Sequence, residues 1–117
     1  MKSVLLVSHG SHSPKTKKEV ARLINSLHRR SKIPIFEYAF LEIESPSIQQ
    51  GIDICVNQGA REVVVLLNFL NSGKHVDEDI PRIIKEAQRK YPEIKFRITQ
   101  PIGQHKQIGE LFLEIIK

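Results

Sequence analysis

Two histidines stand where two predicted strands end. His9 follows the apolar run Val4–Val7, and His75 closes the loop after a second apolar run, Val63–Leu67. The second run is continuously apolar, which is typical of a strand buried on both faces of a parallel sheet. Both histidines are therefore expected at the carboxyl edge of such a sheet, on neighbouring strands, where open α/β sheets bind ligands. Neutral imidazole binds metals and acts as a base near neutral pH, so the pair predicts metal handling or proton abstraction.

A carboxylate joins the pair at the end of another predicted strand. Glu42 could give an oxygen ligand to a divalent metal or accept a proton, although a lone glutamate in a loop is more often simply solvated. His9 could equally shape a turn by bonding to the backbone. Two imidazoles and one carboxylate suit Co²⁺, Ni²⁺, Fe²⁺ or Zn²⁺. The sequence has no Cys-x-x-Cys, and its one His-x-x-His is His9 to His12, so spacing alone is a weak signal for a metal.

Acidic residues follow the second histidine. Asp77, Glu78 and Asp79 come directly after the His75 segment, and Pro81 follows them. These carboxylates could favour a helix N-terminus, with Asp77 or Asp79 as its cap and Pro81 in its first turn. One of them could instead hold His75 through a hydrogen bond and raise its basicity.

The remaining histidines and the cysteine are weaker candidates. His12 is close enough in sequence to assist His9, and His105 could face the same edge. His28 lies among basic residues of a predicted helix and is expected to be exposed. Cys55 is most simply a small buried hydrophobic residue.

Four apolar runs alternate with four helical patterns along the chain. Strands are predicted at about 3–8, 33–41, 63–67 and 95–99, and apolar residues at i, i+3, i+4 and i+7 mark the helix faces. These faces are Val20, Leu23, Ile24 and Leu27; Ile48, Ile52, Cys55 and Val56; Ile80, Ile83, Ile84 and Ala87; and Ile108, Leu111, Phe112 and Ile115.

Local signals mark some of the ends. Ser45-Pro46 is predicted to begin the second helix and Gly59 to end it. The last strand alternates apolar and charged residues, which predicts an edge strand. The regular alternation predicts a parallel sheet with helices on both faces, formed by residues 1–117 as one domain.

Composition narrows the function classes. The chain has 117 residues, one cysteine and a formal net charge of +5. No apolar stretch approaches the ~20 residues that span a bilayer, and the N-terminal run is too short for a signal peptide. We therefore expect a cytoplasmic protein with no membrane partner and an anionic ligand. Dispersed basic residues and the lack of a recognition motif argue against nucleic acid.

The sequence lacks the motifs of several enzyme classes. The sequence has no G-x-G-x-x-G after the first strand, no P-loop and no G-x-S-x-G elbow. A histidine phosphatase usually carries Arg before its first-strand histidine, where this chain has Ser8.

Four sequence pieces together resemble one known family. They are Leu6–Ser11, Phe40–Glu42 with Pro46–Ile48, Phe69–Pro81 and Pro101–Gly103. In this order the chain resembles, over essentially its whole length, the class II tetrapyrrole chelatases that act on sirohydrochlorin, in their short single-lobe form.

The resemblance implies a three-layer α/β/α lobe, flavodoxin-like or Rossmann-like, with a four-stranded parallel sheet. It implies that His9, His75 and Glu42 bind the metal and accept protons. The metal is a substrate, Co²⁺ ahead of Ni²⁺ or Fe²⁺, and no organic cofactor is expected. Long relatives have two lobes, so a homodimer is implied for this chain.

The macrocycle sirohydrochlorin is a polyanion. The residues that we expect to bind it are Gly10, Ser11, Ser72, Gly73 and Lys74. Two positions depart from the family: His12 stands where Arg is frequent, and Leu66-Leu67-Asn68 lacks a frequent Pro. The alternatives are a carrier of metal or tetrapyrrole that does not turn over, and, less favoured, a phosphoryl-transfer enzyme with phosphohistidine at His9.

Overall fold

A four-stranded parallel sheet forms the centre of the molecule. The computed structural model describes residues 1–117, with the strands in the order β2-β1-β3-β4. The strands are β1 (Lys2–Ser8), β2 (Ile35–Phe40), β3 (Glu62–Leu67) and β4 (Lys95–Ile98). The helices are α1 (Pro14–Arg30), α2 (Ile48–Asn57), α3 (Ile80–Lys90) and α4 (Ile108–Ile115), with a short π-helix η1 (His75–Asp79) and a 3₁₀ turn η2 (Ile102–Gln104). The predicted α/β class is confirmed.

The strand order follows from hydrophobicity. β1 and β3 lie at the centre and pair with each other in parallel, with Val4 opposite Val64 and Val7 opposite Leu67. β4 lies at the edge, where its exposed Lys95 and Arg97 alternate with partly buried residues. The predicted central and edge positions are confirmed, and so is the prediction that the strands preceding His9 and His75 are neighbours.

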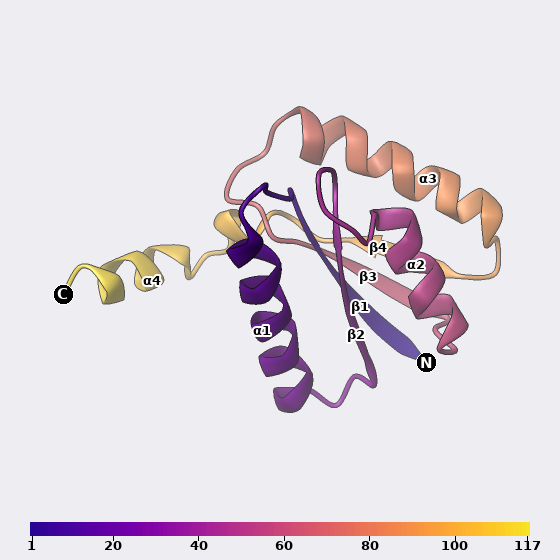
Figure 1. The fold of residues 1–117 in the computed structure, drawn as a ribbon, viewed down its shortest axis with the longest axis horizontal. Helices are drawn as coiled ribbons and strands as arrows, with labels where there is room; N and C mark the ends of the chain where they lie inside the picture. Colours follow the sequence, from indigo (N-terminus) through magenta and orange to yellow (C-terminus); the bar gives the residue numbers. More distant parts are fainter.

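The two faces of the sheet are covered unequally (Figure 1). One face packs under α2 and α3 in a cluster of 15 buried residues, which includes Leu5, Val65 and the predicted buried Cys55. The other face packs under α1 alone, in a cluster of only four buried residues. The lobe is therefore well filled on one side and partly open on the other.

One predicted helix start was wrong. Ser47, not Ser45, caps α2: its hydroxyl accepts from the Gln50 N–H at 3.2 Å, and the Gln50 side chain accepts from the Ser47 N–H at 2.8 Å. This capping box satisfies two free N–H groups at once, which outweighs the preference for proline at the first helical position.

Asp79 stands at the N-cap position of α3, as predicted, but its side chain makes no capping hydrogen bond. The chain already coils from His75 as one wide π turn, so α3 continues an existing helical segment. Pro81 does lie in the first turn of α3, as predicted, and Gly59 ends α2 with a φ of 104°.

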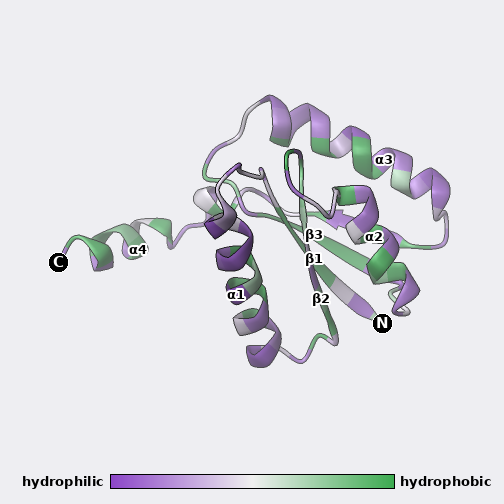
Figure 2. Cartoon of the chain, viewed as in Figure 1, coloured by the Kyte–Doolittle hydropathy of each residue, from purple (hydrophilic) through white to green (hydrophobic).

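Helix α4 leaves the body of the lobe. Its predicted span and apolar stripe are present, but it buries no residue and does not cover the sheet. Figure 2 shows it as a largely apolar helix that extends away from the other elements. No helix is both long and apolar enough to cross a membrane.

Candidate metal centre

Backbone pairing beyond the ends of β1 and β2 brings Glu42 beside His9. The Leu41 N–H donates to the Ser8 carbonyl at 2.8 Å, and the Glu42 N–H donates to the His9 carbonyl at 3.1 Å. The parallel ladder thus continues past the last residues of both strands. Hydrogen bonds between backbone groups therefore fix the spacing of the first two candidate ligands.

Gly10 and Ile43 let the two loops approach this closely. Gly10 has a φ of 105°, and a Cβ atom on it would collide with the backbone carbonyl of Glu42. Ile43 has a φ of 73°, and the Glu44 N–H donates to the Glu42 carbonyl across it at 2.8 Å, which forms a three-residue turn. A β-branched residue rarely adopts this conformation, and such outliers concentrate at functional sites.

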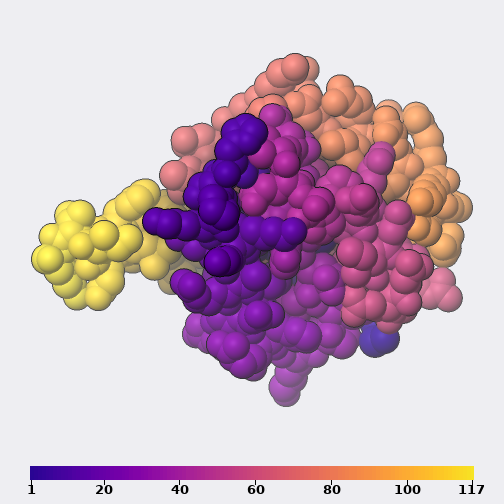
Figure 3. All heavy atoms as spheres, viewed as in Figure 1, coloured from indigo at the N-terminus to yellow at the C-terminus, as the bar shows by residue number.

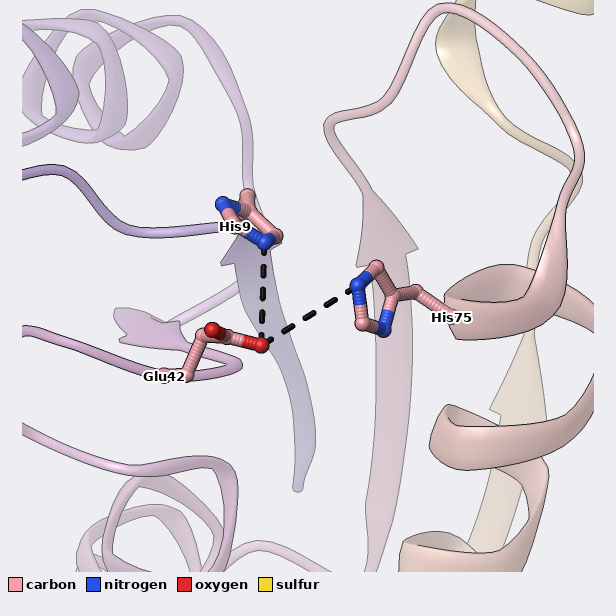
Figure 4. Close-up of side chains that lie close together, drawn as sticks. All are labelled: His9, Glu42 and His75. Carbon is pink, nitrogen blue, oxygen red and sulfur yellow. Dashed lines mark ion pairs between the residues drawn. The ribbon is translucent and has the colours of Figure 1, made fainter.

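His75 reaches the same point from the other side of β1. It is the first residue of η1, on the loop that follows β3. The Nε2 atom of His9 lies 3.7 Å from the Glu42 Oε1 atom, and the Nε2 atom of His75 lies 4.0 Å from the same oxygen. One ligand atom from each residue can be chosen so that all three lie within 4.8 Å of one another (Figure 4). The structure therefore brings the three predicted residues together.

The Nδ1 atom of each imidazole lies within hydrogen-bond distance of an oxygen atom. The His9 Nδ1 lies 3.1 Å from the Gly10 carbonyl oxygen, and the His75 Nδ1 lies 2.7 Å from the Asp79 carboxylate. Each acceptor favours the tautomer with the proton on Nδ1, which leaves the Nε2 lone pair free for a metal or a proton.

Asp79 is the strongest of these orienting groups. The hydrogen bond from His75 holds the pKa of the Asp79 carboxyl below its usual range, and Lys74 and Arg82 add to the effect. The Arg82 guanidinium lies 3.5 Å from the other Asp79 oxygen. The sequence suggested two roles for this acidic cluster, a helix N-terminus or a hydrogen bond to His75. The structure supports the second, with Asp79 as the partner of His75.

The site is open to solvent. The side chains of His9, Glu42 and His75 are 45%, 50% and 43% exposed. Two imidazoles and one carboxylate that reach an ion from one side leave its other coordination positions free, as in known sites with two histidines and one carboxylate. Such a centre can bind an ion while leaving room for a second ligand to the same ion.

The other predicted binding residues surround the centre less closely. Ser72, Gly73 and Lys74 are exposed on the loop before His75, with open space around Gly73. The Ser11 N–H, which was expected to face an anionic ligand, donates to the Glu44 carboxylate at 3.0 Å. The sequence analysis missed this link between the two loops.

Two histidines lie outside the group. The cluster of possible ligand atoms contains neither His12 nor His105. The His105 Nδ1 accepts from the Gln107 N–H at 3.0 Å in the turn before α4, so its role there is local. His28 is exposed, as predicted.

Comparison with known proteins identifies relatives along the whole chain. The CbiX family model matches residues 3–117. A sirohydrochlorin cobaltochelatase of Priestia megaterium is 41% identical over 118 residues, covering 100% of this chain but only 37% of the relative. One of Sulfolobus acidocaldarius is 34% identical and aligns over 97% of this chain and 89% of the relative.

A solved structure has the same fold. The sirohydrochlorin chelatase SirB of Bacillus subtilis subspecies spizizenii, in complex with cobalt, superposes with a TM-score of 0.90 at 30% identity. The match covers 98% of this chain and 49% of SirB, so the chain spans about half of that protein. The sequence match over nearly every residue and the shared fold lead to one conclusion: the chain belongs to the CbiX family.

Proposed function

We propose that this chain is one chelatase lobe, residues 1–117, that inserts a divalent metal into sirohydrochlorin in the cytoplasm. The observation that carries the proposal is the convergence of two free Nε2 atoms and one carboxylate on an exposed sheet edge. The relatives from Priestia and Sulfolobus are both named sirohydrochlorin cobaltochelatase, which supports the substrate and Co²⁺ ahead of Ni²⁺ or Fe²⁺.

The chemistry requires two things from the protein. The metal must exchange water for the four ring nitrogens, and the ring must release two N–H protons for each M²⁺ that enters. His9, His75 and Glu42 would replace water on one side of the ion while the macrocycle approaches from the other. As the ion leaves them, the same atoms regain lone pairs that can accept the released protons, near the natural pH range of imidazole.

The substrate's carboxylates fit the charge of the chain. The formal net charge is +5, and Lys74 lies exposed one residue before His75. The exposed loop of Ser72 and Gly73 leaves space for a flat macrocycle beside the metal, and Gly10 and Ser11 line the opposite loop. These five residues, Gly10, Ser11, Ser72, Gly73 and Lys74, are the proposed substrate contacts.

We further propose that the active form is a homodimer. A single lobe offers one wall to a flat macrocycle, whereas SirB is about twice as long as the matched region. A second copy would supply the other wall.

The test is anaerobic insertion of Co²⁺, Ni²⁺ or Fe²⁺ into sirohydrochlorin, followed by absorbance. We expect many turnovers for the natural chain, and a loss of at least a hundredfold in His9→Ala and His75→Ala. His28→Ala removes a histidine outside the site and should keep full activity. A spectral change that stops at stoichiometric protein would indicate a carrier, and near-normal turnover in both site variants would overturn the proposal.

A further inference from the structure

Ile43, next to the candidate ligand Glu42, combines two features that each cost free energy. It is a β-branched residue with a φ of 73°, a backbone conformation in which such side chains are strained. It is also 48% exposed, so much of its apolar surface stays in contact with water. Either feature alone is unremarked in a folded protein. Their coincidence at one residue points to a contact made outside the lobe.

The loop itself imposes the strained conformation. The Glu44 N–H donates to the Glu42 carbonyl at 2.8 Å across Ile43. This closes a γ-turn, which is rare and strained when its central φ is about +75°. The turn is fastened on both sides, because the Glu42 N–H donates to the His9 carbonyl at 3.1 Å. The Glu44 carboxylate then accepts from the Ser11 N–H at 3.0 Å. Strained residues persist where several bonds determine them in this way.

The turn holds Ile43 beside the metal centre. Ile43 directly follows Glu42, and its own Cβ atom lies 3.5 Å from the point that a Cβ on Gly10 would occupy. Gly10 in turn directly follows His9. Figure 3 shows the two segments in contact at one end of the molecule, the indigo loop after β1 and the magenta loop after β2. An exposed apolar side chain therefore stands between the neighbours of two candidate ligands.

The substrate proposed above lacks an apolar contact in the site. The five residues proposed to bind it offer backbone groups, hydroxyls and one ammonium, and none has a large apolar side chain. The ring system of a tetrapyrrole is flat and largely apolar, with its carboxylates at the rim. Binding sites for such ligands combine apolar side chains with a few polar groups that fix the orientation. Ile43 supplies the apolar group at the required place.

We propose that Ile43 is a substrate-contact residue, whose side chain packs against the ring of sirohydrochlorin when the macrocycle lies over the metal centre. The proposal rests on the function proposed above and adds a residue to its site. The γ-turn thereby gives one short segment two roles. Glu42 offers a carboxylate to the ion, and Ile43 offers an apolar surface to the ring that receives the ion.

Ile43→Asn separates substrate binding from stability. Asparagine adopts a positive φ far more readily than isoleucine, so the variant should be at least as stable in urea as the natural chain. The loss of the apolar surface should weaken the binding of metal-free sirohydrochlorin about tenfold, measured by fluorescence titration. Co²⁺ affinity should be unchanged, because all three ligands remain.

Two further variants are the controls. Ile43→Leu keeps an apolar side chain without the branch at Cβ, so it should retain the affinity for sirohydrochlorin. Ile54→Asn changes another accessible isoleucine, 38% exposed on α2 and outside the metal centre, and should also bind as the natural chain does. In the insertion assay, Ile43→Asn should raise KM while leaving kcat nearly unchanged, as expected when binding common to substrate and transition state is lost.

The outcomes distinguish this contact from the proposed function. Equal affinity of Ile43→Asn and the natural chain for sirohydrochlorin would overturn the contact, and so would an equal loss in Ile54→Asn. A weaker dimer with unchanged affinity for sirohydrochlorin would assign Ile43 to a contact between copies and overturn the proposal as well. If the natural chain binds sirohydrochlorin without turnover, the chelatase function fails, and the binding comparison still decides the contact. A natural chain that does not bind sirohydrochlorin would overturn both.

Discussion

The Glu42 N–H donates to the His9 carbonyl at 3.1 Å, so two candidate metal ligands are joined through their backbones. The position of their side chains therefore depends on the loop around Gly10, where the two segments touch. Any atom added at this contact must separate the ligands.

Gly10→Ala should weaken Co²⁺ binding by at least tenfold. The new Cβ would collide with the Glu42 carbonyl, and alanine disfavours the φ of 105°. Gly73→Ala is the control, because nothing lies within 4 Å of a Cβ there. Isothermal titration calorimetry gives both affinities. Equal affinities in the two variants would show that the contact does not set the ligand spacing.

Asp79→Ala should lower metal affinity by about 10- to 100-fold, the usual effect of losing a group that orients a histidine ligand. The reason is the 2.7 Å contact with the Asp79 carboxylate, which favours the His75 tautomer that carries its proton on Nδ1. Nitrogen-15 NMR of the imidazole reports the tautomer, which a merely structural residue would not change. Asp79→Asn, which keeps an acceptor oxygen, should recover part of the affinity.

The control for Asp79 is its neighbour. Asp77→Ala removes an exposed carboxylate from the same turn and should leave both affinity and tautomer unchanged. If Asp79→Ala behaves in the same way as Asp77→Ala, Asp79 does not position His75.

Ser47→Ala should lower the free energy of unfolding by about 1 kcal/mol, since it removes the side-chain cap of α2. Ser45→Ala, at the position that the sequence pattern favoured, should change it by less than about 0.5 kcal/mol. Urea denaturation of the two variants distinguishes the two helix starts, and a larger loss in Ser45→Ala would reverse the assignment.

Asp53 should make stability depend on pH in acid. The Tyr91 hydroxyl, which donates to it, lowers the pKa of the Asp53 carboxyl, and Lys90 adds to this effect. A lowered pKa stabilises the fold above the ordinary value and loses that contribution as the pH falls through the folded-state pKa. Asp53→Asn should therefore be less stable than the natural chain at pH 6, by up to about 1 kcal/mol for so exposed a pair.

The pH course provides the check. Urea midpoints for the two proteins should converge as the pH falls below about 4. Asp77→Asn, an exposed carboxyl in another part of the chain, should follow the natural protein throughout. A gap between Asp53→Asn and the natural chain that persists at about pH 2 would rule out the charged state of Asp53 as its source.

Much of the fold was predictable because it depends on local patterns. The apolar run at 63–67 predicted the buried central strand, and the alternating charges of Lys95 and Arg97 predicted the edge strand. Once β1 and β3 were neighbours, the meeting of His9 and His75 followed from the parallel sheet.

The remaining features depend on contacts between distant segments. The apolar stripe of α4 predicted an amphipathic helix, but periodicity does not show where a helix packs, and α4 extends away from the sheet. The bond from Ser11 to Glu44 spans 33 residues, and only the folded loops bring the two together. The π turn at His75–Asp79 determines which of the acidic side chains reaches His75. The sequence could therefore suggest that a carboxylate holds His75, but it could not identify Asp79 as that carboxylate.

The open geometry of the centre has a consequence for how long an ion stays. The side chains of the three candidate ligands are 45%, 50% and 43% exposed, so water could reach a bound ion and replace them one by one. A structural metal enclosed by four ligands resists such replacement. This arrangement favours a short residence time of the ion, which suits the proposed transfer of the ion to a macrocycle. Tighter burial of the same three residues would slow the release of a bound ion.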